Sequence, residues 1–424
     1  MSAVSTGRAV LTPVASAAGR WQVTRALRGT AAVGVRPGRV PPLVVLTWGL
    51  LFLNVLPFQG STSILPIPRA AGQLISQGAL VLALGLALLV NHRGTVRTSL
   101  FLVVLSLLPL AGLVTAFQAT YVTGAVFRAV RFVAFLAVLW LLSPWLGRRD
   151  LVLLRSHVAI LRILMGSVAV GFVVAHGHAT AFEGRLSGVI WPIAATQVGH
   201  YSAVLLGITL VAWTCRLVPT RTTLVTLAVV GPVLLLSHTR TALLALLVGL
   251  LVAGATLFLS QARMRRVSTT AAILGMLVAT VFASQVSHWL LRGQTSQNVS
   301  QLTGRTKVWD MVVSQQRSPG HDLFGSGMSN MSFNGLPIDS NWVATYLDGG
   351  WFGIVVEASL LVLLLVMVAV RVRGPQRAIG AFLVVFVSVS SVTETGLSAP
   401  SSYLLDLVVA AALLSSAPRV RSTP

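Results

Sequence analysis

The chain has 424 residues, of which 55% are hydrophobic and 9% are charged, and its formal net charge is +22. Soluble domains carry about 25% charged residues, so a soluble fold of this length is excluded and lipid must solvate much of the surface. The basic residues lie in short clusters between apolar runs, as in membrane loops, which argues against nucleic acid as a partner, and the single cysteine, Cys215, excludes an internal disulfide.

The first 40 residues are rich in Arg, Ala, Gly and Pro and contain no short apolar core before a cleavage site. We therefore predict that residues 1–40 form a disordered cytoplasmic tail and are not a cleaved signal peptide. Beyond them, apolar runs of this length and uniformity favour membrane helices over a barrel. The twelve predicted spans are residues 41–57, 70–90, 98–117, 123–145, 156–176, 193–213, 222–237, 241–260, 270–290, 351–370, 376–393 and 401–417.

The distribution of basic residues predicts which side of the membrane each loop faces. With the N-terminus in the cytoplasm, the inner segments carry 21 basic residues and the outer segments carry seven. This bias follows the positive-inside rule, so both termini are predicted to be cytoplasmic. The predicted fold is an all-α integral membrane protein with about twelve transmembrane helices. Nine of them lie in 41–290, a large outer loop covers 291–350, three more lie in 351–417, and a short cytoplasmic tail covers 418–424.

Charged residues inside the spans lie at comparable depth from the outer side. They are Arg128 and Arg131 in the fourth span, Glu357 in the tenth and Asp406 in the twelfth. A charge inside a membrane span is costly and is usually paired or functional. One interpretation is a structural ion pair, such as Arg128 with Glu357 or Asp406. The other is a polar cavity that opens to the outer leaflet and binds substrate through Arg128, Arg131 and Glu357.

Two outer arginines stand in constrained turns. Arg185 lies in EGRLSG, and Arg240 follows His238 in the tight turn SHTRTA between the seventh and eighth spans. A guanidinium binds phosphate through two parallel hydrogen bonds and stays charged at any working pH. We expect these arginines to hold a diphosphate, with His238 orienting it and Arg305 as a third candidate. The alternative is anchoring to lipid headgroups. His200, in the sixth span, is predicted to be a packed or hydrogen-bonded core residue.

The outer loop begins with a helical pattern. Residues 302–316 have a spacing that puts Val308, Met311 and Val312 on one side of a short amphipathic helix, and Pro319 is predicted to end that helix. The glycine-rich stretch that follows suits close approach of a ligand. We therefore predict an ordered loop that lies over the bundle.

The loop ends in PIDSNWVATYLDGGWFG, residues 337–353, which holds two of the nine acidic residues of the chain. Asp339 is a candidate general base, or alternatively a cap for the helix of the tenth span. Asp348, with the glycine pair after it, is predicted to be a turn signal at the start of that helix. His321, in the glycine-rich stretch, is either a further candidate base or incidental.

Four short motifs follow one another along this loop: G-R-x-x-x-W, P-G-x-x-x-x-G-x-G, D-S-N-W and D-G-G-W-F-G. They comprise Gly304, Arg305, Trp309, Pro319, Gly320, Gly325, Gly327, Asp339, Ser340, Asn341, Trp342, Asp348, Gly349, Gly350 and Gly353. Their order resembles the O-antigen ligase and O-antigen polymerase superfamily. The turns that carry Arg185 and Arg240 are similar to two other recurring elements of that family. The resemblance covers most of residues 180–360, and the place of the loop between the ninth and tenth spans also fits.

The resemblance implies transfer of glycan from a polyprenyl diphosphate carrier at the outer face of a bacterial plasma membrane. Family ligases carry a His where this chain has Asp339, which favours a polymerase. Under this hypothesis Asp339, covered by Trp342, accepts the proton of the attacking sugar hydroxyl, and Asn341, Trp342 and His321 bind substrate. Arg185 and Arg240 stabilise the departing diphosphate. Diphosphate is already a good leaving group, so no metal or other cofactor is expected.

The expected partners are a polyprenyl-diphosphate-linked oligosaccharide, a glycan acceptor and the lipid bilayer. A polymerase also implies a flippase and a chain-length regulator. Two alternatives remain open. One is a ligase that transfers the glycan to a different acceptor, and the other is a transporter or flippase for lipid-linked sugars, which twelve spans and interior charges would suit.

Overall fold

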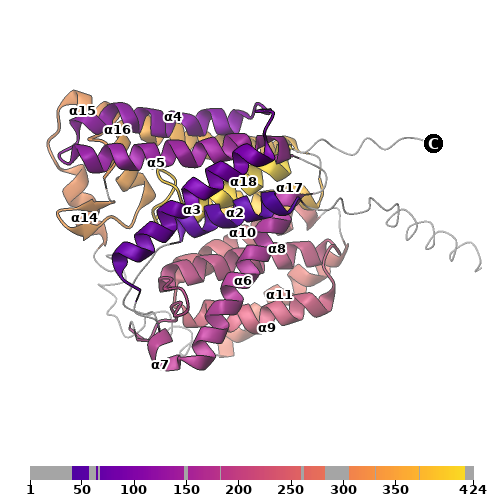
Figure 1. The fold of residues 1–424 in the computed structure, drawn as a ribbon. Coiled ribbons are helices and arrows are strands. Elements are labelled where there is room, and N and C mark those ends of the chain that lie inside the picture. Colours follow the sequence, from indigo (N-terminus) through magenta and orange to yellow (C-terminus); the bar gives the residue numbers. More distant parts are fainter. Residues whose placement is uncertain are drawn as a thin grey trace, which may run out of the picture. The chain divides into compact units, whose positions relative to one another are not determined.

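The structure is a computed structural model that describes residues 41–56, 64, 67–147, 151–181, 183–258, 262–281, 305–329, 331–371 and 373–415. Both predicted cytoplasmic tails lie outside these residues, as do the end of the ninth predicted span and the start of the outer loop. The described part is helical apart from one antiparallel hairpin, β1 (Ser332–Phe333) and β2 (Leu336–Pro337) (Figure 1).

Seven helices of the described part are long and apolar enough to cross a membrane, which supports a multi-pass membrane protein. They are α3 (Arg69–Val90), α4 (Leu100–Thr115, extended by η1, Ala116–Gln118), α5 (Val122–Leu141), α6 (Val152–Val174), α8 (Ala195–Thr214), α10 (Arg240–Phe258) and α16 (Asn341–Val370). Four shorter apolar helices are α2 (Pro42–Val55), α9 (Thr220–Leu236), α17 (Pro375–Ser390) and α18 (Ser402–Ser415). The other helices are η2 (Ser143–Trp145), α7 (His176–Ala179), α11 (Ala262–Val281), α14 (Arg305–Val313) and α15 (Pro319–Phe324).

Every predicted span falls on a helix, and two of these helices begin before the predicted span. The tenth span was expected to start at residue 351, directly after the kink at Gly350, while α16 starts at Asn341 and includes the end of the expected loop. The ninth span was expected from residue 270, whereas α11 starts at Ala262 and includes three arginines in its first turns. Hydropathy alone missed both starts because polar residues occupy the first turns of these helices.

Hydrogen bonds connect segments that were predicted to face the same side of the membrane. On the predicted outer side, backbone bonds run from Ile64 N to Val189 O, from Leu186 N to Leu236 O and from Asn341 N to Ser391 O, at 3.1, 2.9 and 3.0 Å. On the predicted inner side, Arg97 donates to Ser143 Oγ and Leu146 O, and the Arg263 guanidinium lies 4.2 Å from the centre of the Trp213 ring. The contacts therefore sort these loops into the two sets that the arginine pattern predicts.

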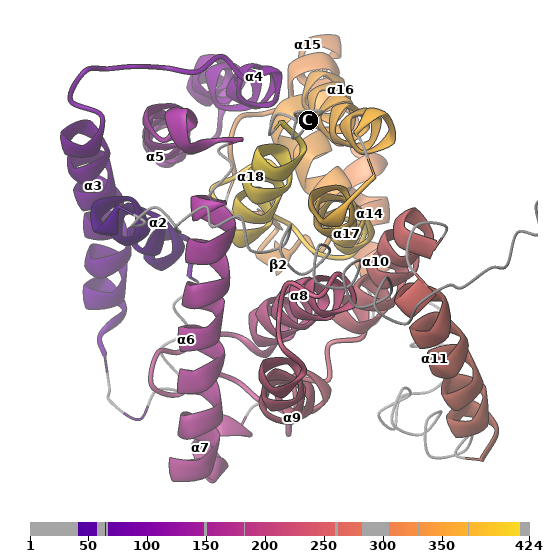
Figure 2. The same ribbon diagram turned by 90° about the vertical axis from the view of Figure 1, so that its right-hand side faces the viewer.

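Helix α17 lies in the interior, in contact with α8, α10, α16 and α18, while α11 lies at one edge beside α10 (Figure 2). Glycines permit the close packing around α17. A Cβ on Gly207 of α8 would lie 1.8 Å from the ring of Phe382 in α17, and one on Gly249 of α10 would lie 2.8 Å from it. Small residues let helices approach closely where lipid, rather than water, is the solvent. This packing brings the ends of α8, α10, α17 and α18 together.

Candidate functional site

The outer loop has a small hydrophobic core of its own. Val308 and Val312 of α14 pack with Ile338, Ala344 and Leu347, which belong to the start of α16 and the segment before it. The predicted amphipathic helix is thus confirmed over Arg305–Val313; residues 302–304 of the prediction lie outside the described residues, and the helix ends before the expected residue 316. Met311, which was expected on the same buried side, is 40% exposed. Pro319 does not end this helix, because α14 ends at Val313 and Pro319 starts α15.

The glycines of the loop allow backbone segments of the protein to pack closely against each other. Helix α16 has a kink at Gly350, whose φ of 59° and ψ of −158° lie in a region that only glycine adopts readily. A Cβ there would lie 2.6 Å from Asp322 O, and a Cβ on Gly325 would lie 2.3 Å from the carbonyl of Asp348. Ser326 N also donates to Leu347 O at 3.0 Å. The close approach that was predicted for a ligand is therefore made by the kink of α16.

Asp348 is buried and lies just before the kink at Gly350, where a second helical segment of α16 begins, so the predicted turn signal falls on a real break in the helix. Its carboxylate accepts hydrogen bonds from Ser329 and lies in the field of Arg128 and Arg317. Arg128 itself donates to Met328 O at 3.1 Å. This aspartate therefore fastens the glycine-rich segment to α16.

The arginines of the fourth predicted span do not form the ion pair that was expected. Arg128 binds the Met328 carbonyl, and Arg131 donates to the main-chain and side-chain oxygens of Asn54 at 2.9 and 3.3 Å. Among the described ion pairs, neither arginine meets Glu357 or Asp406. These contacts give both arginines structural roles, since Arg128 holds the outer loop and Arg131 joins α5 to α2.

Glu357 and Asn341 form a buried network within α16. Glu357 is 1% exposed and accepts hydrogen bonds from Asn341 Nδ2 and from Thr345 Oγ1, the latter at 2.8 Å. The Asn341 Oδ1 accepts from the backbone N–H groups of Gly396 and Leu397 at 3.2 and 2.8 Å. Both residues were predicted to bind substrate, whereas their polar atoms meet other parts of the protein. Asn341 thereby fixes the turn between α17 and α18.

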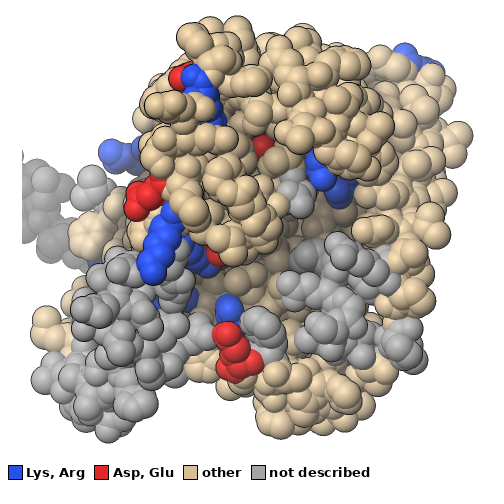
Figure 3. All heavy atoms as spheres, turned by 90° about the vertical axis from the view of Figure 1, so that its left-hand side faces the viewer, with Lys and Arg blue, Asp and Glu red and all other residues tan. Residues whose placement is uncertain are grey.

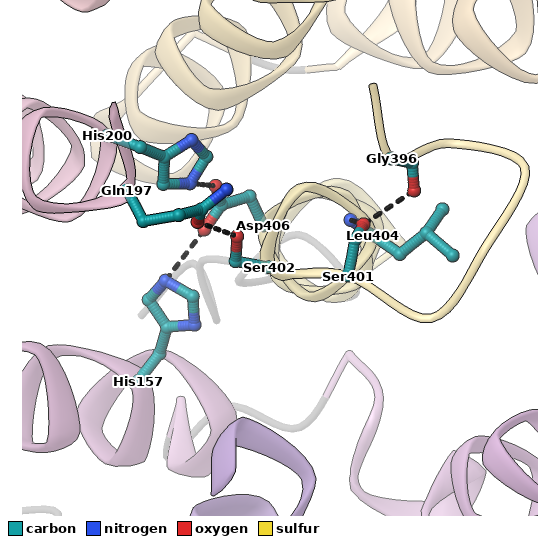
Figure 4. A network of polar contacts seen from close by, with 8 residues as sticks. All are labelled: His157, Gln197, His200, Gly396, Ser401, Ser402, Leu404 and Asp406. Carbon is teal, nitrogen blue, oxygen red and sulfur yellow. Dashed lines mark hydrogen bonds and ion pairs between the residues drawn. The ribbon is translucent and has the colours of Figure 1, made fainter. Parts of the chain in front are cut away.

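Asp406 binds two histidines (Figure 4). His157 Nε2 lies 2.9 Å from Asp406 Oδ1, and His200 Nε2 lies 2.8 Å from Asp406 Oδ2, with all three side chains buried. This confirms the prediction of a hydrogen-bonded His200. Sequence analysis missed His157, although a histidine inside an apolar span is itself a signal of a polar partner. Within the described residues, no group of three or more His, Cys, Asp or Glu is arranged to hold a metal ion.

The predicted arginine turns lie against each other at the end of the bundle that was predicted to face outward. Arg185 Nε donates to Ser237 O at 3.2 Å, and its Nη2 lies 3.5 Å from Thr239 Oγ1. His238, at φ 49°, makes the sharp turn into α10, whose first residue is Arg240. The structure therefore brings the Arg185 side chain to the turn that carries His238 and Arg240, as the diphosphate hypothesis requires.

Arg305, the first residue of α14, contacts the segment before α16 and the turn after α17 at the same end. Its Nε binds Asp339 Oδ2 at 3.1 Å and its Nη1 donates to Thr393 O at 3.1 Å. The Oγ1 atoms of Thr393 and Thr241 lie 2.7 Å apart, which joins this group to the first turn of α10. The side chain of Asp339 is 41% exposed, so water and Arg305 both stabilise its carboxylate. Asp339 does not cap α16, because its N-cap is Ser340.

Glu394 is the residue of this site that sequence analysis did not single out. It follows Thr393, interacts electrostatically with Arg305, Asp339 and Arg185, and lines a narrow crevice with Thr239, Thr241, His200 and Tyr403. Burial raises the pKa of Glu394 to about 7; the charges of Arg305 and Arg185 act against this rise, and that of Asp339 adds to it. The sequence does contain a signal for Glu394, because a chain with few acidic residues places this one in a short, predicted outer turn.

Two predicted residues have no contact with this group in the described part of the chain. Trp342, in the first turn of α16, is partly buried. His321 is in α15, where its N–H donates to Ser318 Oγ at 3.4 Å, and α15 packs on α16. The group at the predicted outer end, which we call the arginine–glutamate site, thus consists of Arg185, Arg305, Asp339, Glu394 and the turn 237–240.

Figure 3 looks onto the end of the molecule where α14 and α15 lie. Most of the surface it draws is uncharged, and basic and acidic side chains occur next to each other on it. Positive and negative groups placed together at one end of an apolar bundle are suited to bind an anionic headgroup and to move a proton.

No protein-family model matches the chain, and no curated protein matches it.

Proposed function

We propose that the chain is a membrane glycosyltransferase that polymerises glycan units carried on a polyprenyl diphosphate, at the outer face of a bacterial plasma membrane. In this proposal all twelve predicted spans cross the bilayer and both termini face the cytoplasm. The short helices α2, α9, α17 and α18 then cross together with their flanking residues, because a span needs about 20 residues.

One observation supports this proposal above the others. Arg185 and Arg305, which lie 120 residues apart in sequence, are both near enough to the carboxylate of Glu394 for their charges to lower its pKa. Their hydrogen bonds run to Ser237 O, Thr239 Oγ1 and Thr393 O, and Thr239 lines the same crevice as Glu394. Two guanidinium groups can stabilise the negative charge on a departing diphosphate, and a carboxylate beside them can accept the proton of the attacking hydroxyl.

The reaction we propose is a direct displacement. A hydroxyl oxygen of the acceptor sugar attacks the anomeric carbon of the lipid-linked sugar and forms the new C–O bond. The bond between that carbon and the diphosphate oxygen breaks, and its electron pair stays on the diphosphate. Arg185, Arg305 and the turn that carries Arg240 stabilise the growing negative charge. The hydroxyl proton passes to a carboxylate of the site.

The test is a transfer assay in proteoliposomes that hold the purified protein and a polyprenyl-diphosphate-linked oligosaccharide, without an ion gradient. The proposal predicts that the glycan chains lengthen and that one polyprenyl diphosphate is released for each glycan unit added. Arg185→Lys should reduce turnover at least about tenfold, because an ammonium cannot make the two parallel bonds of a guanidinium. Arg93→Lys is the matched control, since Arg93 is exposed on a predicted inner turn, and it should leave turnover unchanged.

The same assay separates the alternative functions. Transfer to a foreign acceptor without lengthening of the donor glycan would make the protein a ligase. Movement of the intact lipid-linked oligosaccharide across the bilayer, with no glycan transfer, would make it a transporter or flippase. Wild-type protein that does neither lengthening nor transfer contradicts the proposal.

A further inference from the structure

The turn that carries Glu394 is fixed on both sides. On one side, Thr393 O accepts from Arg305, and Thr393 Oγ1 meets Thr241 Oγ1. On the other side, Asn341 Oδ1 accepts hydrogen bonds from the backbone N–H groups of Gly396 and Leu397. A carboxylate on a turn held in this way has little freedom to move. Such a preorganised group is what general base catalysis requires.

The two outer carboxylates of the site have different surroundings. Asp339 forms an ion pair with Arg305, and its side chain is 41% exposed. Arg305 directs its other described bond to the Thr393 carbonyl and not to the Glu394 carboxylate. Among the described ion pairs none involves Glu394, which is partly exposed and lines the crevice beside Thr239 and Thr241.

We propose that Glu394, and not Asp339, is the general base that removes the proton from the acceptor hydroxyl. This inference rests on the proposed glycan transfer and identifies the side chain that accepts the proton. As the new C–O bond forms, the O–H bond breaks and its proton goes to a carboxylate oxygen of Glu394. The diphosphate departs with the electron pair of the broken bond. Glu394 then releases the proton to the outer solvent and is ready for the next hydroxyl.

Burial is the largest influence on the basicity of Glu394, and Asp339 and the arginines modify it. Burial raises the pKa of Glu394 to about 7, Arg305 and Arg185 lower it, and Asp339 raises it. The other ionisable residues that line the crevice are His200 of α8 and Tyr403 of α18, while the elements around it also carry Arg240 of α10 and Asp406 of α18, which binds His200. Because a base must be ionised to act, turnover should fall as the pH drops through about 7. A general base contributes roughly 10²- to 10⁴-fold to the rate.

The experiment is the pH profile of transfer in the proteoliposomes, for the wild type and single variants. Glu394→Gln should lose roughly 10²- to 10⁴-fold in turnover and lose the acid limb near pH 7. Asp339→Asn should keep the acid limb but move it to lower pH, since a negative neighbour is removed. Arg305→Gln should move the limb to higher pH. Glu183→Gln removes the exposed glutamate at the predicted outer end, and it should leave the profile unchanged.

Infrared titration supplies a readout without turnover. In the difference between the wild-type and Glu394→Gln spectra, a protonated carboxyl component should appear below about pH 7. The two proteins should have the same unfolding temperature, so that the difference does not come from loss of structure. An active Glu394→Gln variant with a wild-type pH profile overturns the inference. So does an Asp339→Asn variant that loses both turnover and the acid limb. Absence of transfer by the wild type at every pH contradicts the proposed function itself.

Discussion

Replacing Gly350 by alanine tests how the outer loop is built. The backbone at Gly350 has φ 59° and ψ −158°, and an added Cβ would lie 2.6 Å from Asp322 O and from Gly325 N. The unfavourable backbone conformation costs about 1–3 kcal/mol, and forcing a methyl group against packed backbone costs about 1–3 kcal/mol more. We therefore expect Gly350→Ala to lower the free energy of unfolding by about 2–6 kcal/mol, measured by thermal unfolding in detergent.

The neighbouring residue provides the matched control. Gly349 has no atom within 4 Å of an added Cβ and lies inside the helix, so Gly349→Ala should be neutral or stabilise the protein by about 0.5–1 kcal/mol. The difference between the two variants removes effects that come from the chemistry of alanine itself. Equal unfolding temperatures for Gly350→Ala and Gly349→Ala would refute the kink and its contact with the glycine-rich segment.

Three other predictions follow from the buried polar contacts. Asn341→Ala leaves the Glu357 carboxylate with fewer donors and should lower the free energy of unfolding by about 2–5 kcal/mol, and a variant as stable as the wild type would contradict this role. Asp406→Ala leaves two buried imidazole groups without their acceptor and should cost about 3–5 kcal/mol, whereas unchanged thermal unfolding would argue against the network. Arg305→Lys cannot hold both Asp339 and the Thr393 carbonyl, so transfer should fall at least about tenfold, and full turnover in the assay would remove Arg305 from the site.

The helices were predictable because lipid imposes a simple rule on the sequence. Long apolar runs must satisfy their backbone groups internally, so hydropathy located a helix at each span. It failed where polar residues are helical for tertiary reasons. Asn341 starts α16 because its side chain binds Glu357 and the turn before α18, contacts that no local pattern reveals. Met311 has the spacing of a buried residue, but the neighbours that cover Val308 and Val312 do not reach it.

The site was predictable in part. Constrained outer turns pointed to Arg185 and Arg240, and the structure places the Arg185 side chain against the Arg240 turn. The contribution of Glu394 depends on burial and on arginines that are distant in sequence, so composition and spacing could not isolate it. Likewise, His157 and Asp406 meet only through the packing of α6 against α18.

The arrangement of Arg185, Arg305 and Glu394 is the claim on which the functional account depends, and a cryo-electron-microscopy map of the protein with bound polyprenyl diphosphate tests it directly. The account predicts density for both phosphates beside the guanidinium groups of Arg185 and Arg305, with the Glu394 carboxylate on the acceptor side. Phosphate density at another part of the molecule, with these side chains unchanged from the free protein, would contradict it.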